Sequence, residues 1–283
     1  MNILTFDIEE WFHLLNNPLT KSPKNWSDFE SRIERNMDSI FELLDKTNSK
    51  ATFLVLGWIA KKYPHIVKRI NDLGYEIGSH THTHQLIFEQ GKLNFKNDLE
   101  ISINLLEDLT GKKIRIFRAP SFSITKNSLW ALDILASNGI ETDCSIFPAN
   151  RSNGGLNEIN INDPFMINYR GIQLKEFPIN FSTILKKKIV LNGGGYFRFF
   201  PELIIRRFIK KSSYNMTYFH PRDFDFYQPR LKNLNLLNYF KSYVGLKNCY
   251  NKLENILNEF EFKDVSHYDK LIDWNNMKKV YLK

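Results

Sequence analysis

The chain is predicted to fold as an α/β protein with a mainly parallel sheet or barrel covered by helices. Short apolar runs alternate with longer segments whose apolar residues recur at helical spacing. Each of the short runs is continuously apolar, as expected for parallel strands that are buried on both faces. Together, these two patterns indicate a repeated strand–helix order along the chain.

The first half of the chain shows this alternation most clearly. Ser27 is expected to cap the first helix, with Glu30 three residues later. Residues 9–26 contain Asn and Pro breakers and are expected to form a loop. The expected strands are 3–7, 51–56, 75–79 and 114–117, and the expected helices are 27–44, 58–73, 94–109 and 125–136.

The second half is less regular. The alternation weakens from Phe147 onward, and frequent Asn, Gly and Pro residues indicate an irregular insertion around residues 147–200. Beyond it we expect a basic helix at 201–211, a strand at 215–219 and a helix at 251–260. No linker-like segment is visible, so residues 1–283 are expected to form a single domain.

Composition limits the class of protein. Hydrophobic residues make up 42% of the chain, which is enough for a sizeable core. The two cysteines, Cys144 and Cys249, exclude a disulfide framework and fit a reducing compartment. The first residues lead directly into a strand, without the pattern of a signal peptide, so a cytoplasmic protein is expected. The formal net charge of +8 favours an anionic partner or surface.

Polar residues gather at one position in the pattern, the carboxyl ends of predicted strands. In parallel α/β folds the loops that leave these ends converge and form the site. Because side chains alternate along a strand, Asp7 and Glu9 can point the same way. The sequence therefore predicts one cleft that contains Asp7, Glu9, His80, His84, Arg118 and His220.

The segment Gly78–His84 reads Gly-Ser-His-Thr-His-Thr-His. His80 and His84 are four residues apart, so on a helical turn they lie on one side and can share a metal. His82 is expected to support the site or to face the substrate. A catalytic zinc also needs a third ligand and an open position. Two histidines and a carboxylate would equally suit a non-haem iron oxygenase, but that class favours an all-β scaffold, which the alternation argues against.

Four ordered segments resemble the polysaccharide deacetylases of carbohydrate esterase family 4. They are the acidic strand end in 5–13, His-Thr-His-Thr-His at 80–84, Phe-Arg-Ala-Pro-Ser-Phe at 117–122 and Tyr-Phe-His-Pro at 218–221. Residues 143–148 and 193–198 further resemble the branch found in exopolysaccharide loci. The acidic motif in residues 5–13 departs from the family's adjacent aspartates, because Ile8 separates Asp7 from Glu9.

The resemblance implies a fold, an activity and a cofactor. The fold would be a distorted (β/α) barrel of seven or eight strands. The activity would be removal of N-acetyl groups from an acetamido sugar in a bacterial polysaccharide or its precursor. A divalent metal, expected to be Zn²⁺, would be held by Glu9, His80 and His84. Glu10 is an alternative to Glu9, although strand alternation would point it away.

The resemblance also implies catalytic roles. Asp7 would be the general base, and Arg118 would keep it ionised and oriented. His220 would be the general acid that protonates the departing sugar nitrogen. The backbone N–H of Ser121 would help to stabilise the oxyanion. Asp143 is the nearest match to the family's fourth motif and is the candidate partner of His220.

The remaining expectations concern partners. Trp11, Tyr196 and Arg198 are candidates for contact with a glycan substrate, and no nucleic-acid partner is expected. A catalytically inactive homologue that binds glycan is the alternative to an enzyme. Basic and apolar residues alternate near Lys186 and Lys187 and on the 201–211 helix, which includes Arg206 and Arg207. This pattern suggests peripheral contact with the anionic inner face of a membrane.

Overall fold

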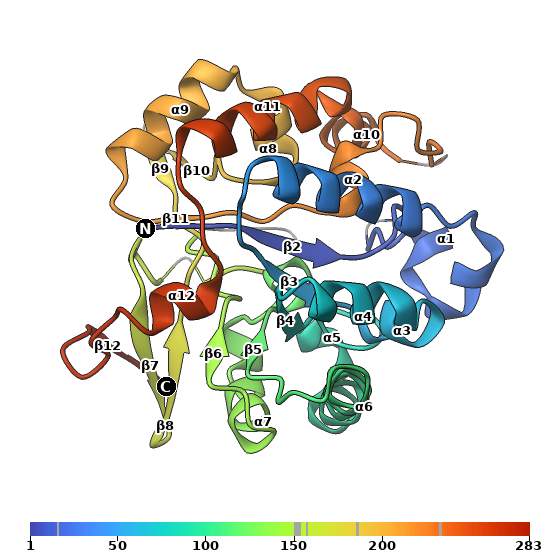
Figure 1. Ribbon diagram of the computed structural model, residues 1–283. Helices are drawn as coiled ribbons and strands as arrows, with labels where there is room; N and C mark the ends of the chain where they lie inside the picture. The colour runs from blue at the N-terminus through green and yellow to red at the C-terminus, as the bar shows by residue number, and fades with distance from the viewer. Residues whose placement is uncertain (16, 150–153, 157, 185–186, 232–233) are drawn as a thin grey trace.

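An eight-stranded, mostly parallel sheet forms the centre of the computed structural model, which describes residues 1–283 apart from 16, 150–153, 157, 185–186 and 232–233 (Figure 1). Neighbouring strands run parallel, except that β7 and β8 are antiparallel. In spatial order the strands are β12 (Lys279–Leu282), β7 (Phe165–Tyr169), β8 (Ile172–Glu176), β6 (Thr142–Asp143), β5 (Ile116–Phe117), β4 (Glu76–Ser79), β3 (Thr52–Val55) and β2 (Thr5–Ile8).

A second, short parallel pair continues the curved sheet beyond β2. Strand β1 (Asn2–Ile3) pairs with β11 (Asn215–Met216), and Phe6 bridges to Phe219. The segment that leads to His220 therefore lies directly beside β2. This arrangement is the distorted barrel expected from the sequence, with a shorter late strand than predicted. A hairpin of β9 (Ser182–Ile184) and β10 (Lys187–Ile189) stands apart from the sheet.

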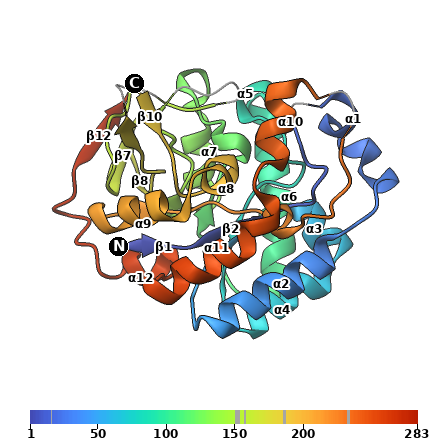
Figure 2. The same ribbon diagram turned by 90° about the horizontal axis from the view of Figure 1, so that it is seen from above.

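Helices cover the outside of the sheet. In Figure 1, α2 and α11 lie above β2, α3 and α4 lie beside β3 and β4, and α6 and α7 lie at the bottom; Figure 2 gives the view from above. The longer helices are α2 (Ile33–Lys46), α3 (Gly57–Lys62), α4 (Pro64–Asp72), α6 (Lys92–Thr110), α7 (Ala131–Ser137), α8 (Gly194–Phe199), α9 (Glu202–Lys211), α10 (Leu236–Tyr243) and α11 (Leu246–Glu259). Shorter ones are α1 (Pro18–Lys21), α5 (Ile87–Gln90) and α12 (Val265–Asp269).

The core explains why the strands are continuously apolar. Every residue of β2 and β3 is buried, because helices cover one face and the barrel interior the other. The main apolar cluster runs from Leu4 to Phe262. A second cluster includes Leu54, Ile116 and Met216, which come from three different strands. Among the described residues, no helix is long and apolar enough to cross a membrane.

Three helix predictions need correction. The predicted 125–136 helix is a 3₁₀ turn at Lys126–Ser128 followed by α7, which begins at Ala131. The first helix begins at Ile33 rather than after Ser27, because residues 23–28 form a 3₁₀ helix. Its first N–H groups are capped by the Glu10 carboxylate, which accepts from Arg32 and Ile33. The predicted 58–73 helix is two helices, since Pro64 cannot continue the first and opens the second.

Part of the predicted insertion belongs to the main sheet. Strands β7 and β8 lie within residues 147–200 and pair with the other strands of this sheet. Strand β12, from the far end of the chain, joins β7. Helix α9 forms as predicted. Its Phe208 and Ile209 pack in the core, and Arg206 forms ion pairs with Glu202 and Glu259. Lys186 lies outside the described residues. Arg206 of the predicted membrane-facing set is thus paired with acidic residues, and membrane contact of this set stays a prediction.

Candidate active site

The predicted polar residues do meet at the carboxyl ends of the strands. Asp7 and Glu9 come from the end of β2, His80 and His84 from the turn after β4, and Arg118 directly follows β5. His220 follows the segment beside β2, where the Asp7 N–H donates to the Phe219 carbonyl over 2.8 Å. Residues more than two hundred positions apart thus become neighbours through one parallel pairing.

One carboxylate lies at the centre of this cluster. Glu9 Oε2 lies 3.1 Å from His84 Nε2, and Glu9 Oε1 lies 3.7 Å from His80 Nε2 and 3.3 Å from His220 Nε2. Two overlapping sets could hold a metal ion, Glu9 with His80 and His84, and Glu9 with Asp7 and His220. Two imidazoles and one carboxylate match the His₂Glu set of catalytic zinc, which favours the first.

The two histidines of this set are prepared for ligation. His80 Nδ1 lies 2.8 Å from the Arg118 carbonyl, which fixes the ring so that Nε2 faces Glu9. His84 is buried, and among the described residues its Nδ1 has no hydrogen-bond partner, while its Nε2 meets only the Glu9 carboxylate, 3.1 Å away. Because Nε2 points at the same carboxylate that His80 faces, the three side chains fit a shared metal ion.

The charge on Glu9 suits the same role. Burial opposes ionisation, but the neighbouring imidazoles of His84, His80 and His220 outweigh it and hold the pKa of the Glu9 carboxyl well below its usual value. Glu10 points the other way and caps α2 through Arg32 and Ile33. The acidic candidate at the metal set is therefore Glu9, as alternation predicted.

The histidine turn is held by contacts that the sequence did not reveal. Asp98 of α6 accepts hydrogen bonds from the backbone N–H groups of His82 and Thr83 over 2.7 and 3.0 Å. Gly57 donates to the Thr81 carbonyl, and a Cβ at Gly57 would lie 2.6 Å from His82 Nδ1. The turn thus packs tightly against the start of α3.

Backbone strain also concentrates at the site. Thr81 and His84 have φ values of 69° and 53°, and Ser121 and Phe122 have values of 51° and 55°. Side chains at positive φ are uncommon and persist where surrounding contacts enforce them. Ser121, the candidate oxyanion donor, therefore lies in a turn whose shape is set by its surroundings rather than by local preference.

Asp7 and Arg118 form a buried pair. Arg118 Nη1 donates to Asp7 Oδ1 and to Thr5 Oγ1, both over 2.7 Å, and Nε donates to the Cys144 carbonyl. The Arg118 side chain is fully buried. It therefore holds one oxygen of Asp7 and leaves Oδ2 facing His220 Nε2, 3.9 Å away. This is the positioning role expected for Arg118.

The partner of His220 is Asp223, and the prediction of Asp143 is wrong. Asp223 Oδ2 lies 3.2 Å from His220 Nδ1 and accepts from the His220 backbone N–H over 2.9 Å. Burial opposes the charge on His220, but Asp223, Glu9 and Asp7 raise the pKa of its imidazole to about 9. His220 is about one quarter exposed (24%), so it can reach a ligand.

Arg198 supports this pair instead of binding substrate. Its Nε lies 3.1 Å from Asp223 Oδ1, and its terminal nitrogens donate to the carbonyls of Lys241, Ser242 and Val244. The side chain is buried, so the prediction of substrate contact is wrong. Burial opposes the Asp223 charge, but Arg198 and His220 lower the pKa of Asp223 to about 2.

Asp143 forms a different buried pair, with Glu176. The two residues are opposite each other in the register of β6 and β8, and both are fully buried. One oxygen of each has no hydrogen-bond partner within the described residues. Burial raises the pKa of Asp143 to about 6, and burial together with Asp143 raises the pKa of Glu176 well above its usual value. Both carboxyls therefore favour their protonated forms more than exposed acids do.

The three remaining candidates for substrate contact lie in different surroundings. Trp11 is buried and donates to the Glu30 carbonyl, so its proposed stacking on a sugar is wrong. His82 is half-buried, lies against Gly57 and belongs to neither metal set, so its supporting or substrate-facing role stays a prediction. Tyr196 is exposed on α8 beside Phe200, where contact with a glycan stays a prediction.

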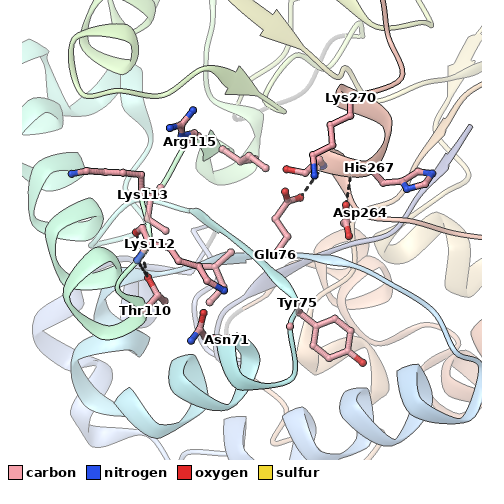
Figure 3. A pocket seen from close by; sticks show the side chains of 15 residues that line it. Asn71, Tyr75, Glu76, Thr110, Lys112, Lys113, Arg115, Asp264, His267 and Lys270 are labelled. Atoms are coloured by element: carbon pink, nitrogen blue, oxygen red, sulfur yellow. Dashed lines mark hydrogen bonds between the residues drawn. The ribbon is translucent and has the colours of Figure 1, made fainter.

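A pocket of about 560 Å³ lies at the opposite end of the strands (Figure 3). Its lining includes Glu76 at the start of β4, Arg115 just before β5, and Lys112, Lys113 and Lys270. Neither metal-binding set lies there. Lys113 and Arg115 already pair with Glu107 and Glu141. The chemistry of the site is thus separate from this pocket.

Known proteins that are similar to this chain include deacetylases, the class that the site residues resemble. Residues 19–141 match the polysaccharide deacetylase family, and residues 144–270 match a domain of unknown function, DUF3473. Residues 19–141 therefore form a polysaccharide deacetylase domain of carbohydrate esterase family 4. A peptidoglycan-N-acetylglucosamine deacetylase of Bacillus cereus is 31% identical over 116 residues, which cover 37% of this chain and 42% of that protein. The chain covers less than half of the length of the curated relatives that it matches.

Solved structures confirm the fold. A structure from Mycobacterium smegmatis, described as a polysaccharide deacetylase, superposes with a TM-score of 0.66 at 16% identity. The match covers 99% of this chain and 92% of that one. A pseudoenzyme of the same family from Bacillus anthracis gives a TM-score of 0.51 at 14% identity, over 99% of this chain and 66% of that one. Because pseudoenzymes share this fold, activity depends on the residues of the site.

Proposed function

We propose that this deacetylase is a metal-dependent hydrolase that removes the N-acetyl group from an acetamido sugar of a bacterial exopolysaccharide or its precursor. The observation that carries the proposal is the convergence of Asp7, Glu9, His80, His84 and His220 within a few ångströms at one strand edge. The parallel α/β fold is not the all-β scaffold of the iron oxygenases that share a His/His/carboxylate set.

Glu9, His80 and His84 would hold the divalent metal. When bound, a metal such as Zn²⁺ polarises a carbonyl oxygen and lowers the pKa of a coordinated water. The imidazole of His80 is already fixed through its other nitrogen, and Glu9 is held in its ionised form. Little reorganisation of the chain is therefore needed to present these three side chains.

Asp7 would accept the proton of the attacking water through Oδ2, since Oδ1 is occupied by Arg118. The new C–O bond forms at the acetyl carbon as its carbonyl becomes an oxyanion, which the N–H of Ser121 would help to stabilise. His220 would then donate its proton to the sugar nitrogen as the C–N bond breaks. Acetate and a free amino sugar are the products.

The raised pKa of His220 supports the role of acid. An acid must carry its proton at the working pH, and Asp223 keeps the imidazole charged up to about pH 9. The presence of a candidate base, a positioned acid and a metal set at one strand edge supports an active enzyme over a glycan-binding homologue without activity. Tyr196, exposed on the surface, is the remaining candidate for substrate contact.

Acetate release from short N-acetylglucosamine oligosaccharides tests the proposal. Wild-type protein should release acetate, and Asp7→Asn and His220→Ala should each lower kcat by about 10²–10⁴-fold while keeping the metal. Trp11→Phe, a change in the buried core beside the site, is the control for nonspecific damage. A wild-type protein that binds metal and oligosaccharide but releases no acetate would identify a binding homologue instead.

A further inference from the structure

An exposed apolar face lies on α10 and the neighbouring end of α8. Leu236 and Leu237 are 90% and 61% exposed, and Phe240 and Phe199 are 49% and 54% exposed. The rings of Phe199 and Phe240 contact each other at 5.6 Å, which joins the two helices into one surface. Large apolar side chains grouped in this way mark an interaction site more often than isolated ones do.

The chain segment that contains α10 and the start of α11 carries charge of one sign. Residues 226–253 contain no Asp or Glu, whereas they include Arg230, Lys232, Lys241, Lys247 and Lys252. Lys241 and Lys247 are exposed, and none of the basic residues described in this stretch forms an ion pair. Arg230 lies over the Tyr239 and Tyr243 rings and donates to the Tyr239 hydroxyl. The face thus combines apolar side chains with uncompensated positive charge.

We propose that α10 is an interfacial helix that rests on an anionic membrane surface. Leu236 and Leu237 would enter the boundary of the acyl chains, and Lys241 and Lys247 would lie at the level of the anionic headgroups. This site differs from the basic helix that the sequence suggested, where Arg206 is paired with acidic residues.

The other partners fit less well. Aliphatic side chains cannot hydrogen-bond a sugar, and the Asn235 side chain is already used to cap α10, where it accepts from the Asn238 N–H. A second copy of the chain would bring two positively charged faces together, which costs free energy. Exposed leucines beside unpaired lysines are instead the pattern of an amphipathic helix at a lipid surface.

The attachment of α10 links this surface to the proposed catalytic acid. Arg198 donates to the carbonyls of Lys241 and Ser242 and also pairs with Asp223, which holds His220. A membrane-bound α10 would therefore bring the His220 end of the barrel toward the bilayer. An acetamido sugar carried on a lipid could then enter the site without leaving the membrane.

Vesicle sedimentation tests this inference. The full chain is mixed with vesicles of phosphatidylcholine alone or of equal parts phosphatidylcholine and phosphatidylglycerol. We expect salt-sensitive binding to the anionic vesicles only. Leu236→Ser/Leu237→Ser should weaken binding by at least about tenfold, and Lys241→Gln/Lys247→Gln by roughly the same factor. Hydrolysis of a soluble oligosaccharide should be unchanged in both variants, so this test is independent of the proposed activity.

The matched control is Leu93→Ser/Leu271→Ser, which removes two leucines of similar exposure, 71% and 69%, outside this face. It should bind vesicles like the wild type. Three results would overturn the inference. They are no binding of wild type to anionic vesicles at low salt, undiminished binding by Leu236→Ser/Leu237→Ser, and a wild-type dimer that this variant converts to monomer.

Discussion

Replacement of Asp223 by Asn should change the pH range in which the enzyme works. Asp223 is the strongest of the groups that stabilise the charge on His220, and together these groups raise the pKa of the imidazole from 6.5 to about 9. That difference corresponds to about 3 kcal/mol in favour of the protonated form. Loss of the carboxylate charge should lower the pKa of His220 by roughly one to two units, the usual effect of one nearby opposite charge.

The sign of the effect follows from the role of His220. A general acid is active while protonated, so kcat/KM falls as the pH rises through its pKa. In Asp223→Asn this alkaline fall should move to lower pH by about one to two units. Activity near pH 6 should change little, while activity near pH 9 should fall by roughly 5–50-fold, because the wild-type imidazole is itself only half protonated there.

The assay is the pH dependence of kcat/KM for acetate release, with metal content measured at each pH. The matched control is Asp143→Asn, which changes the acid that the sequence nominated and that the structure places beside Glu176. An alkaline limb that stays in place in Asp223→Asn, or one that moves in Asp143→Asn, would refute the assignment of Asp223 as the partner of His220.

Three other perturbations follow from the contacts around the site. Burial raises the pKa of Asp143 from 3.8 to about 6, so between these pH values the folded protein holds a proton that the unfolded chain has lost. The free energy of unfolding should therefore fall by about 3 kcal/mol as the pH rises through this window. Glu176→Gln should flatten that fall, measured by urea unfolding at roughly pH 3.5 and pH 8. Asp98→Ala should weaken metal affinity by about 10–100-fold, measured by competition with a chelator, since it frees the histidine turn. Gly57→Ala should lower the midpoint of thermal unfolding, because its Cβ would lie 2.6 Å from His82 Nδ1; an unchanged midpoint would contradict this packing.

The first strands and the polar residues at their ends could be predicted because they depend on local patterns. Apolar runs identified β2 and β3, and polar residues after β2 and β4 located Glu9 and His80. Strand alternation also predicted that Glu9, and not Glu10, points toward the histidines, as it does in the structure. These features require only the periodicity of a strand and the convergence of loops at one edge.

Long-range partners could not be predicted in this way. Asp98 reaches the histidine turn from α6, and Arg198 reaches Asp223 from α8, across distances in sequence that no periodicity encodes. Asp223 itself carried a local signal, since it lies three residues after His220 and closes the turn that begins with Pro221. Recognition of that capping pattern would have identified it ahead of Asp143.

The strands at the far edge of the sheet could not be located from the sequence, for a related reason. β7 and β8 contain polar residues, and β12 alternates exposed and half-buried positions, so none reads as a buried parallel strand. Their place is set by pairing with one another at the end of the sheet. The apparent insertion is therefore an edge of the barrel sheet, which tolerates polar residues better than its centre does.

The central claim is that Glu9, His80 and His84 bind the one metal that deacetylation requires. The most direct measurement is acetate release from an N-acetylglucosamine oligosaccharide while Zn²⁺ is titrated into chelator-treated protein. We predict activity that rises to a plateau at one equivalent of metal per chain, and a His80→Ala protein that is folded but neither binds the metal tightly nor releases acetate. Full activity in the chelated wild type, or wild-type metal occupancy in folded His80→Ala, would contradict the claim.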